Sequence, residues 1–279
     1  MQTHVDPFNG RGYVVLRGVI EPAAVRAARR EMEGLVEEQA AKLLAAGKIR
    51  DPWKDEPFAT RLYRLYENCL DVAPKSFRQE LHRPGLFGVF FHPKVLDVVE
   101  EFLGGEIRLY PNYTARPKFP EWEGTQVLWH QDGGYTEQVA DGGEQTVEQL
   151  RMVNAWTPLV PARVANGCMQ FIPGTHALGV VPHTKRRHYL EIADEVLRPR
   201  LSQAVDIELD PGDVVLFHNL LFHQGKPNRT QQIRWSLDWR YQDATQPTLR
   251  KESGHPARSR RDPERAVQNA EQWARLSFT

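Results

Sequence analysis

Hydrophobic positions along this chain repeat first with a helical period and later with the shorter period of strands. Apolar residues recur at helical spacing over residues 22–46, and Gly47 follows as a stop signal, which predicts one long helix. A β-branched run at 12–19 predicts a strand, and 54–66 and 95–103 are further helix candidates. The N-terminal third is therefore expected to be a helical scaffold.

From residue 106 onward the pattern changes to short apolar runs between turns. These runs predict strands at residues 106–114, 126–132, 151–159, 168–172, 204–209, 213–217 and 233–241. Short strands with glycine and proline turns favour a sandwich or barrel, and the preceding helices would cover the outer face of one sheet. We expect a mainly β fold with flanking helices, a double-stranded β-helix (jelly roll, cupin-like) with N-terminal helices packed on one sheet.

We interpret residues 1–279 as a single domain, with a helical scaffold at about 20–105, a jelly-roll core at about 106–245 and a tail at 246–279. The tail is expected to hold a short helix over 263–276. No internal repeat or low-complexity linker divides the chain.

Composition and charge restrict the class of protein. Hydrophobic residues make up 41% of the 279 residues, enough for a sizeable core. Lys+Arg and Asp+Glu each number 36, and this zero net charge argues against nucleic acid or an anionic membrane as the main partner. The two cysteines, Cys69 and Cys168, provide neither a zinc-ligand spacing nor a disulfide framework. Without a signal peptide or an 18-residue apolar run, we expect a cytoplasmic monomer or homodimer.

A histidine and an aspartate, His130 and Asp132, lie two positions apart at the end of one predicted strand. The alternation of a strand would place both side chains on one face. An imidazole and a carboxylate side by side are two thirds of the 2-His-1-carboxylate triad that binds non-haem Fe(II) and leaves coordination positions open. A plain surface turn entering Gly133 and Gly134 is the alternative interpretation.

A second histidine for such a triad would come from a distant strand. His218 and His223 are the candidates, and because they lie five positions apart in an extended segment, only one of them can point inward.

The predicted strand at 233–241 separates tryptophans on one face from charged residues on the other. Arg234 and Ser236 lie on the charged face with Asp238 and Arg240. A buried guanidinium requires an anionic partner. Either Arg234 pairs with Asp238 or another carboxylate of the chain, or Arg234 and Ser236 bind a dicarboxylate co-substrate.

Five segments carry motifs in a fixed order, and together they span about residues 10–241. They are Trp129–Asp132 (Trp-His-Gln-Asp), Asn166–His176 (ending Pro-Gly-Thr-His), Pro211–His218, Leu221–Asn228 and the single Arg234. In this order and spacing they resemble the phytanoyl-CoA dioxygenase family of Fe(II)/2-oxoglutarate-dependent oxygenases.

The resemblance implies a role for each matching residue. His130, Asp132 and His223 occupy the positions of the family's iron ligands, and His218 falls where the family has an ordinary strand residue. Arg234 occupies the position that binds the far carboxylate of 2-oxoglutarate, and Ser236 completes an Arg-x-Ser pair.

Other positions follow from the resemblance less directly. Asn112, Lys118 and Trp156 lie about where the family places further contacts to 2-oxoglutarate, with ordinary strand side chains as the alternative. The chain departs from the family at Gly225, where a Ser or Thr often stands two residues after the distal histidine. One hydrogen bond to the co-substrate is then missing or comes from Ser236.

The activity implied is hydroxylation of a small-molecule substrate with Fe(2+), 2-oxoglutarate and O2, releasing succinate and CO2. Related halogenases have a small residue where this chain has Asp132, so halogenation is not expected. The alternatives are a cupin-like metal- or ligand-binding protein and a metal-dependent isomerase without 2-oxoglutarate turnover.

Two long segments are candidate lids over the mouth of the barrel. The acidic one, 133–150, carries Glu137, Asp141, Glu144 and Glu148. The basic one, 181–200, carries His183, Lys185, Arg186, Arg187 and His188, which either meet an anionic substrate or form a solvated face.

Overall fold

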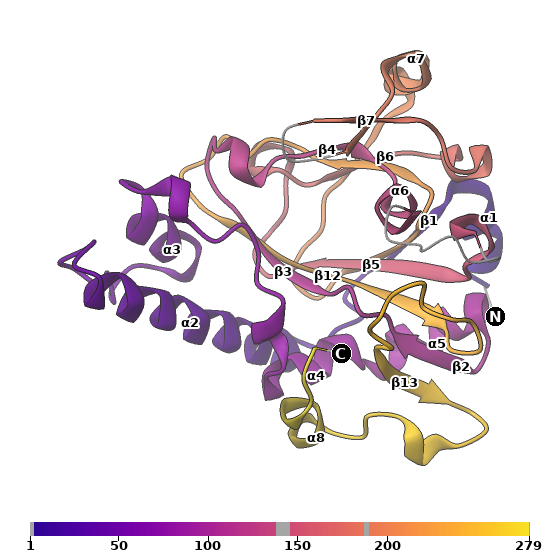
Figure 1. Ribbon diagram of the computed structural model, residues 1–279, viewed down its shortest axis with the longest axis horizontal. Helices are drawn as coiled ribbons and strands as arrows, with labels where there is room; N and C mark the ends of the chain where they lie inside the picture. Colours follow the sequence, from indigo (N-terminus) through magenta and orange to yellow (C-terminus); the bar gives the residue numbers. More distant parts are fainter. Residues whose placement is uncertain (1–2, 138–145, 187–189, 279) are drawn as a thin grey trace.

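The computed structural model describes residues 3–137, 146–186 and 190–278. Two antiparallel sheets face each other, and most of the helices lie on the outer side of the larger sheet (Figure 1). A two-stranded ribbon of β7 (His183–Lys185) and β8 (Leu190–Ile192) contacts the smaller sheet through β4. This arrangement is the predicted double-stranded β-helix with helices on one sheet.

The larger sheet has seven strands in the order β1-β10-β5-β12-β2-β13, and β3 pairs with the first half of β12. Its strands are β1 (Tyr13–Leu16), β2 (Glu106–Leu109), β3 (Thr114–Lys118), β5 (Met152–Pro158), β10 (Val214–His218), β12 (Arg234–Asp243) and β13 (His255–Ser259). The smaller sheet has the order β4-β11-β6-β9. Its strands are β4 (Val127–His130), β6 (Met169–Ile172), β9 (Val205–Ile207) and β11 (Phe222–Gly225).

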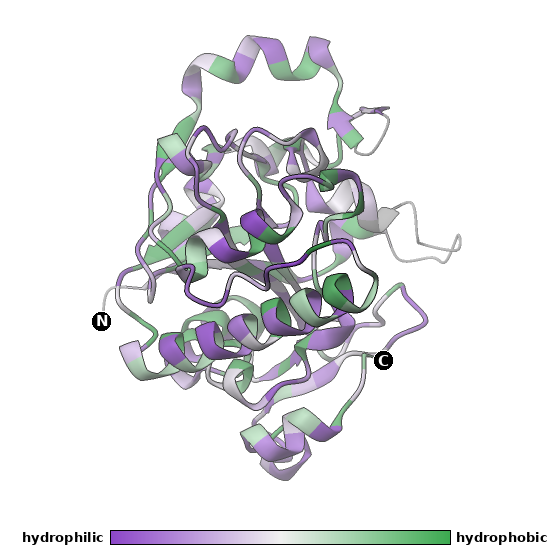
Figure 2. Cartoon of the chain, turned by 90° about the vertical axis from the view of Figure 1, so that its left-hand side faces the viewer, coloured by the Kyte–Doolittle hydropathy of each residue, from purple (hydrophilic) through white to green (hydrophobic). Residues whose placement is uncertain are grey.

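The helices include one that is much longer than the others, α2, whose hydrophobic and hydrophilic residues are interleaved (Figure 2). The α-helices are α1 (Val5–Arg11), α2 (Pro22–Ala45), α3 (Phe58–Tyr66), α4 (Phe87–Phe90), α5 (Pro93–Leu103), α6 (Asp132–Glu137), α7 (Asp194–Leu197) and α8 (Ala270–Arg275). Pro22 opens α2, where its missing N–H costs no hydrogen bond, and the predicted apolar positions Val25, Ala28, Met32, Leu35 and Leu43 are all buried.

The strand β12 has an apolar face and a charged face, as its sequence predicts. Trp235, Leu237, Trp239 and Tyr241 are fully buried and belong to the same apolar cluster as residues of α2 to α5. The alternate residues of β12 are therefore turned toward the smaller sheet. The large sheet thus presents its charged residues to the space between the two sheets.

Several boundaries differ from the sequence expectations. The predicted strand 106–114 is two strands, because Pro111 has no N–H to donate to a ladder and the chain turns there before β3. The predicted strand 126–132 ends at His130, and Asp132 begins α6. Strands β7, β8, β11 and β13 were not anticipated. The expected helix at 263–276 is a 3-10 turn, Pro263–Arg265, followed by α8.

The C-terminal segment packs on the helical side of the molecule. β13 pairs with β2, and Trp273 of α8 is fully buried and stacks on the ring of His82 at 4.0 Å. Among residues 3–137, 146–186 and 190–278, no helix combines the length and apolar character that a membrane crossing requires.

Candidate active site

Two histidines face each other across neighbouring strands of the smaller sheet. His130 ends β4, and His223 of β11 is its direct partner in the antiparallel register. Each ring turns Nδ1 to the backbone carbonyl two residues before it, that of Leu128 at 2.7 Å for His130 and that of Leu221 at 2.8 Å for His223. A ring nitrogen facing a carbonyl carries the proton, so each Nε2 keeps its lone pair. Both rings are thus in the tautomer that binds a metal through Nε2.

His223 is neutral near pH 7. Burial, together with the nearby His130, lowers the pKa of His223 to about 3. A metal ion requires the neutral imidazole, so no proton has to be displaced from this ring before a metal binds.

Asp132 completes a group of three metal-ligating side chains. Its Oδ1 lies 3.3 Å from Nε2 of His130 and 3.8 Å from Nε2 of His223. The three ligand atoms lie within 4.8 Å of one another. Metal bonds of about 2.0–2.2 Å to a shared ion give ligand separations of this order. Two imidazole nitrogens and one carboxylate oxygen are the donor set that suits non-haem Fe(II), and the structure brings the three predicted ligands together.

The surface-turn interpretation of His130 and Asp132 is wrong, because only 7% of His130 is exposed. The competing histidine, His218, belongs to the other sheet. Its Nδ1 accepts a hydrogen bond from the backbone N–H of Leu220 at 3.1 Å, and its ring lies 5.1 Å from that of His176. His223 therefore joins the cluster and His218 does not.

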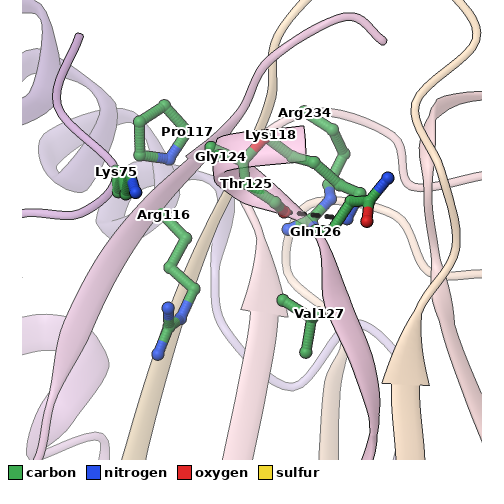
Figure 3. A pocket seen from close by; sticks show the side chains of 9 residues that line it. All are labelled: Lys75, Arg116, Pro117, Lys118, Gly124, Thr125, Gln126, Val127 and Arg234. Carbon is green, nitrogen blue, oxygen red and sulfur yellow. Dashed lines mark hydrogen bonds between the residues drawn. The ribbon is translucent and has the colours of Figure 1, made fainter. Parts of the chain in front are cut away.

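A cavity of about 260 Å³ lies between β3, β4 and β12 (Figure 3). Its lining includes the buried cations Lys118 and Arg234, which are direct partners in the antiparallel register of β3 and β12. Like charges directly opposite each other destabilise a sheet, and an anion bound between Lys118 and Arg234 would offset this repulsion.

Neither cation bonds a carboxylate among the described residues. The Nζ of Lys118 donates to the carbonyls of Thr125 at 3.2 Å and Gly225 at 3.3 Å. Arg234 donates from Nε to the carbonyl of Gly167 at 3.2 Å and from Nη1 to the hydroxyl of Ser236. Burial lowers the pKa of Arg234 to about 10, and burial with the neighbouring Arg234 lowers that of Lys118 to about 7.

Further predicted residues surround Arg234. Its guanidinium lies over the ring of Trp156, 5.2 Å from the centroid, which fixes the plane of the side chain. Gly225 lacks the expected hydroxyl, and a Cβ at this position would lie 3.4 Å from Nζ of Lys118. The amine of Lys118 thus stands beside the position where the family often has Ser or Thr.

Asn112 lies away from the Arg234 end of the cavity. Its carbonyl accepts a hydrogen bond from Arg240 Nη1 at 3.1 Å, and its side-chain Oδ1 is buried without a partner in the described part of the chain. Because Arg240 contacts Asp132, Asn112 is placed toward the metal-ligating cluster.

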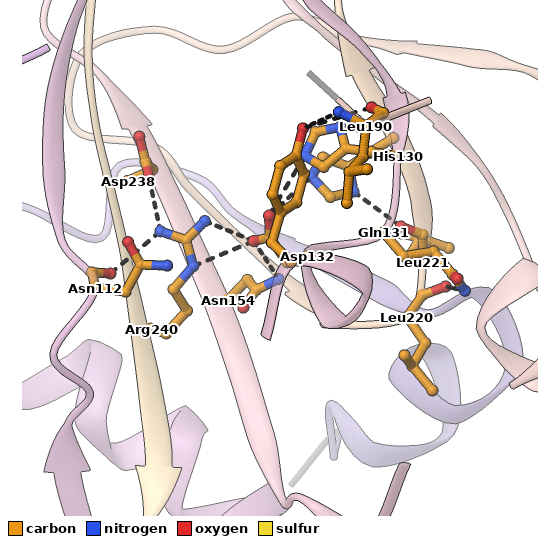
Figure 4. Close-up of polar contacts among 12 residues, drawn as sticks. Asn112, His130, Gln131, Asp132, Asn154, Leu190, Leu220, Leu221, Asp238 and Arg240 are labelled. Carbon is orange, nitrogen blue, oxygen red and sulfur yellow. Dashed lines mark hydrogen bonds and ion pairs between the residues drawn. The ribbon is translucent and has the colours of Figure 1, made fainter. Parts of the chain in front are cut away.

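The second oxygen of Asp132 is held by the larger sheet (Figure 4). Oδ2 accepts hydrogen bonds from Arg240 Nη2 at 2.6 Å, Arg240 Nε at 3.1 Å and Asn154 Nδ2 at 2.9 Å. Burial by itself would raise the pKa of Asp132, but Arg240 and the two histidines hold it well below its usual range. The carboxylate stays ionised, with Oδ1 left to face the two histidines.

Sequence reasoning missed three supporting side chains. Asn154 is buried in β5. The one sequence signal of its role is that an amide side chain stands within a largely apolar run. Gln131 joins three segments, donating to the carbonyls of Gly179 at 2.8 Å and Leu220 at 2.7 Å and accepting from the N–H of Val181 at 3.0 Å. The third is His183, in the basic segment 181–200. Its Nε2 accepts a hydrogen bond from the backbone N–H of Gln131 at 3.3 Å.

The two candidate lids contact each other close to the histidines. The hydroxyl of Tyr135, whose ring lies 5.4 Å from that of His130, accepts from the N–H of Leu190 at 2.9 Å. Arg186 is paired with Glu191 at 2.7 Å, which fits a solvated face. Of the predicted lid residues, Asp141, Glu144, Arg187 and His188 lie outside the described residues.

The family model of phytanoyl-CoA dioxygenase (PhyH) matches residues 8–236 of the chain. The chain belongs to this family. The 1-deoxypentalenic acid 11-beta-hydroxylase of Streptomyces arenae is 28% identical over 252 residues, covering 85% of this chain and 80% of that protein. Membership confirms the predicted enzyme class, a non-haem oxygenase that uses iron, 2-oxoglutarate and O2.

Solved structures confirm the fold of this PhyH-family member. The apo form of the non-haem monooxygenase ThoJ superposes with a TM-score of 0.61 and 22% identity, covering 91% of this chain and 83% of that one. EctD from S. alaskensis, crystallised with 2-oxoglutarate and 5-hydroxyectoine, gives a TM-score of 0.57 and 20% identity, covering 98% and 83%.

Proposed function

We propose that this chain hydroxylates a small-molecule substrate, with Fe(II) held by His130, Asp132 and His223 and 2-oxoglutarate held by Arg234. The observation that carries the proposal is the combination of the metal-ligating cluster with the cavity lined by Lys118 and Arg234. Iron bound here would couple oxidation of 2-oxoglutarate by O2, giving succinate and CO2, to insertion of one oxygen atom into a substrate C–H bond.

The residues of the chain divide the remaining work. The two histidines and an ionised Asp132 would supply three ligands from one side, which leaves the other positions for the co-substrate and O2. Arg234 and Lys118 neutralise the far carboxylate, with Ser236 and Trp156 keeping the guanidinium in place. Asn112, near the metal-ligating cluster, is the candidate for the other end of the co-substrate. Because Asp132 would occupy one metal position, hydroxylation is favoured over halogenation.

Succinate production tests the proposal. Purified protein is supplied with Fe(II), 2-oxoglutarate and air, and succinate is quantified over hours to include turnover without substrate. The chain offers two histidines of consecutive strands for comparison, the buried His223 and the half-buried His218. His223→Gln is expected to abolish succinate release, and His218→Gln is expected to retain it, because His218 lies outside the cluster. Iron-loaded protein that never forms succinate would favour the cupin-like binding protein or the isomerase instead.

The proposal extends to the setting of the enzyme. Free cysteines at Cys69 and Cys168 support a reducing cytoplasm. We infer a single domain that acts on a small molecule as a monomer or homodimer. The balanced charge of the chain supports a partner other than nucleic acid or a membrane.

A further inference from the structure

Four arginines gather on the inner side of the larger sheet, next to the metal-ligating cluster. Arg116 of β3 and Arg240 of β12 both bond Asp238, each at 2.7 Å. The backbone of Phe77 pairs with that of Ala115, which brings Arg78 beside Arg116. Arg250 lies over the ring of Tyr110, 5.8 Å from its centroid, and Tyr110 donates its N–H to the carbonyl of Arg240. We call Arg78, Arg116, Arg240 and Arg250 the arginine cluster.

Carboxylates of the chain satisfy only half of the arginine cluster. Asp238 forms ion pairs with both Arg116 and Arg240, and Arg240 forms a second ion pair with Asp132. Within the described residues, the side chains of Arg78 and Arg250 bond no carboxylate, and Nε of Arg250 is buried without a hydrogen-bond partner. Burial, the larger cause, and repulsion from Arg116, the smaller one, lower the pKa of Arg78 to about 10. Arg78 therefore stays charged at pH 7.

The co-substrate does not supply the missing negative charge. Under the proposed function, the charges of 2-oxoglutarate are met by iron and by Lys118 and Arg234 at the far end of β3 and β12. The positive charge around Asp238 therefore remains after iron and 2-oxoglutarate have bound. Half-buried guanidinium groups without a counter-charge are costly, and a third anion would offset that cost.

We propose that the arginine cluster binds a carboxylate of the substrate, chiefly through Arg78 and Arg250. This inference rests on the proposed function and names the class of its substrate, a small carboxylic acid. The planar guanidinium fork matches a carboxylate. Two members of the cluster already bind one in this place, since Asp238 accepts one hydrogen bond from Arg116 and one from Arg240. Because Arg240 bridges Asp238 and Asp132, an acid anchored here presents its neighbouring carbons to the metal-ligating cluster.

The test measures binding to the iron-loaded protein without oxygen, in the presence of saturating 2-oxoglutarate so that Arg234 is occupied. Hexanoate, hexanamide and hexyl phosphate are titrated by calorimetry as matched probes. The variants are Arg78→Gln and Arg250→Gln, and the control is Arg26→Gln, an exposed arginine of α2 on the helical side of the molecule. The visible band of the iron–2-oxoglutarate complex reports, in each variant, that the fold and the co-substrate site are intact.

We expect hexanoate to bind saturably and at least about tenfold more tightly than hexanamide, which is about 1.4 kcal/mol. Arg78→Gln and Arg250→Gln should each weaken hexanoate about tenfold, and Arg26→Gln should not. Equal binding of acid and amide, no saturable binding, or unchanged affinity in both variants would overturn the inference. Tighter binding of hexyl phosphate would replace the carboxylate by a phosphate. A missing visible band contradicts the proposed function instead, and the comparison of variants with hexanoate still decides this inference.

Discussion

Asp132 divides its carboxylate between two tasks, and this division sets the geometry of the metal-ligating cluster. One oxygen faces the histidines, and the other accepts three hydrogen bonds from Arg240 and Asn154. A carboxylate held in this way cannot rotate to present both oxygens to a metal. Side chains of the larger sheet thus orient Asp132, although Asp132 itself follows β4 of the smaller sheet.

Removing Arg240 is expected to weaken metal binding. Arg240→Gln leaves Asn154 as the donor to Oδ2 of Asp132 and the carboxylate less well oriented, so the affinity for Fe(II) or Co(II) should fall about 10- to 100-fold. Competition with a coloured chelator measures this affinity. Arg116→Gln is the matched control, because Arg116 bonds Asp238 but neither histidine nor Asp132. Equal metal affinity in both variants would show that Arg240 does not position the ligand.

Lys118 should make co-substrate binding depend on pH. With a pKa of about 7, its amine is charged below pH 7 and loses that charge as the pH rises. The dissociation constant of 2-oxoglutarate should therefore increase above pH 7, by at most about tenfold per pH unit. Calorimetry with Co(II) in place of iron measures this between pH 6.5 and 8.5.

Replacing each of the two lysines that line this cavity separates the effect of Lys118 from that of a nearby charge. Lys118→Met should bind 2-oxoglutarate more weakly at pH 6.5 and lose the pH dependence, whereas Lys75→Met, which removes an exposed amine at the rim, should keep it. A wild-type affinity that is constant over this range would contradict a role for the Lys118 ammonium.

At the scale of elements, β12 connects the core to the chemistry. Its tryptophans anchor the sheet to the helices, and this fixes the opposite face, where Arg234 and Arg240 lie six positions apart. The two ends of the site are consequently held on one rigid strand.

The packing of α2 against the neighbouring helices α3 and α4 should account for a measurable share of the stability. Met32 is fully buried on α2, so Met32→Ala is expected to lower the free energy of unfolding by about 2–5 kcal/mol. Urea denaturation measures the change. Glu33→Ala, at the next and exposed position of the helix, should change it by less than about 0.5 kcal/mol. Similar losses in both variants would contradict the assignment of this stability to the burial of Met32.

Periodic elements could be predicted from the sequence, and elements defined by their partners could not. The α2 helix and the two faces of β12 follow from residues close in the chain. By contrast, β13 has no alternating pattern and becomes a strand through its pairing with β2. Asp132 was expected on a strand, but the chain turns into α6 at that residue, and the three ligand atoms converge because of that turn.

The same distinction applies to the site. The candidate metal ligands and Arg234 could be named from sequence motifs, because their residue types by themselves indicate the proposed chemistry. Asn154 and His183 are ordinary residues whose roles come from contacts 22 and 52 positions away in the sequence. Such contacts exist only after the two sheets have come together.

At the scale of the whole molecule, the two sheets bring opposite contributions to one space. The smaller sheet and the start of α6 supply two histidines and a carboxylate, and the larger sheet supplies cations and the apolar backing of the helices. A metal ion is complementary to the first surface, and a dicarboxylate would offset the charges of Lys118 and Arg234 on the second.

Iron and 2-oxoglutarate are proposed to bind together between these sheets, and anaerobic titration of the iron-loaded protein with 2-oxoglutarate tests this most directly. We predict a weak visible charge-transfer band that saturates with 2-oxoglutarate, needs a much higher concentration in Arg234→Gln, and is absent in Asp132→Ala. Iron that binds to the wild-type protein without producing this band at any 2-oxoglutarate concentration would contradict the account.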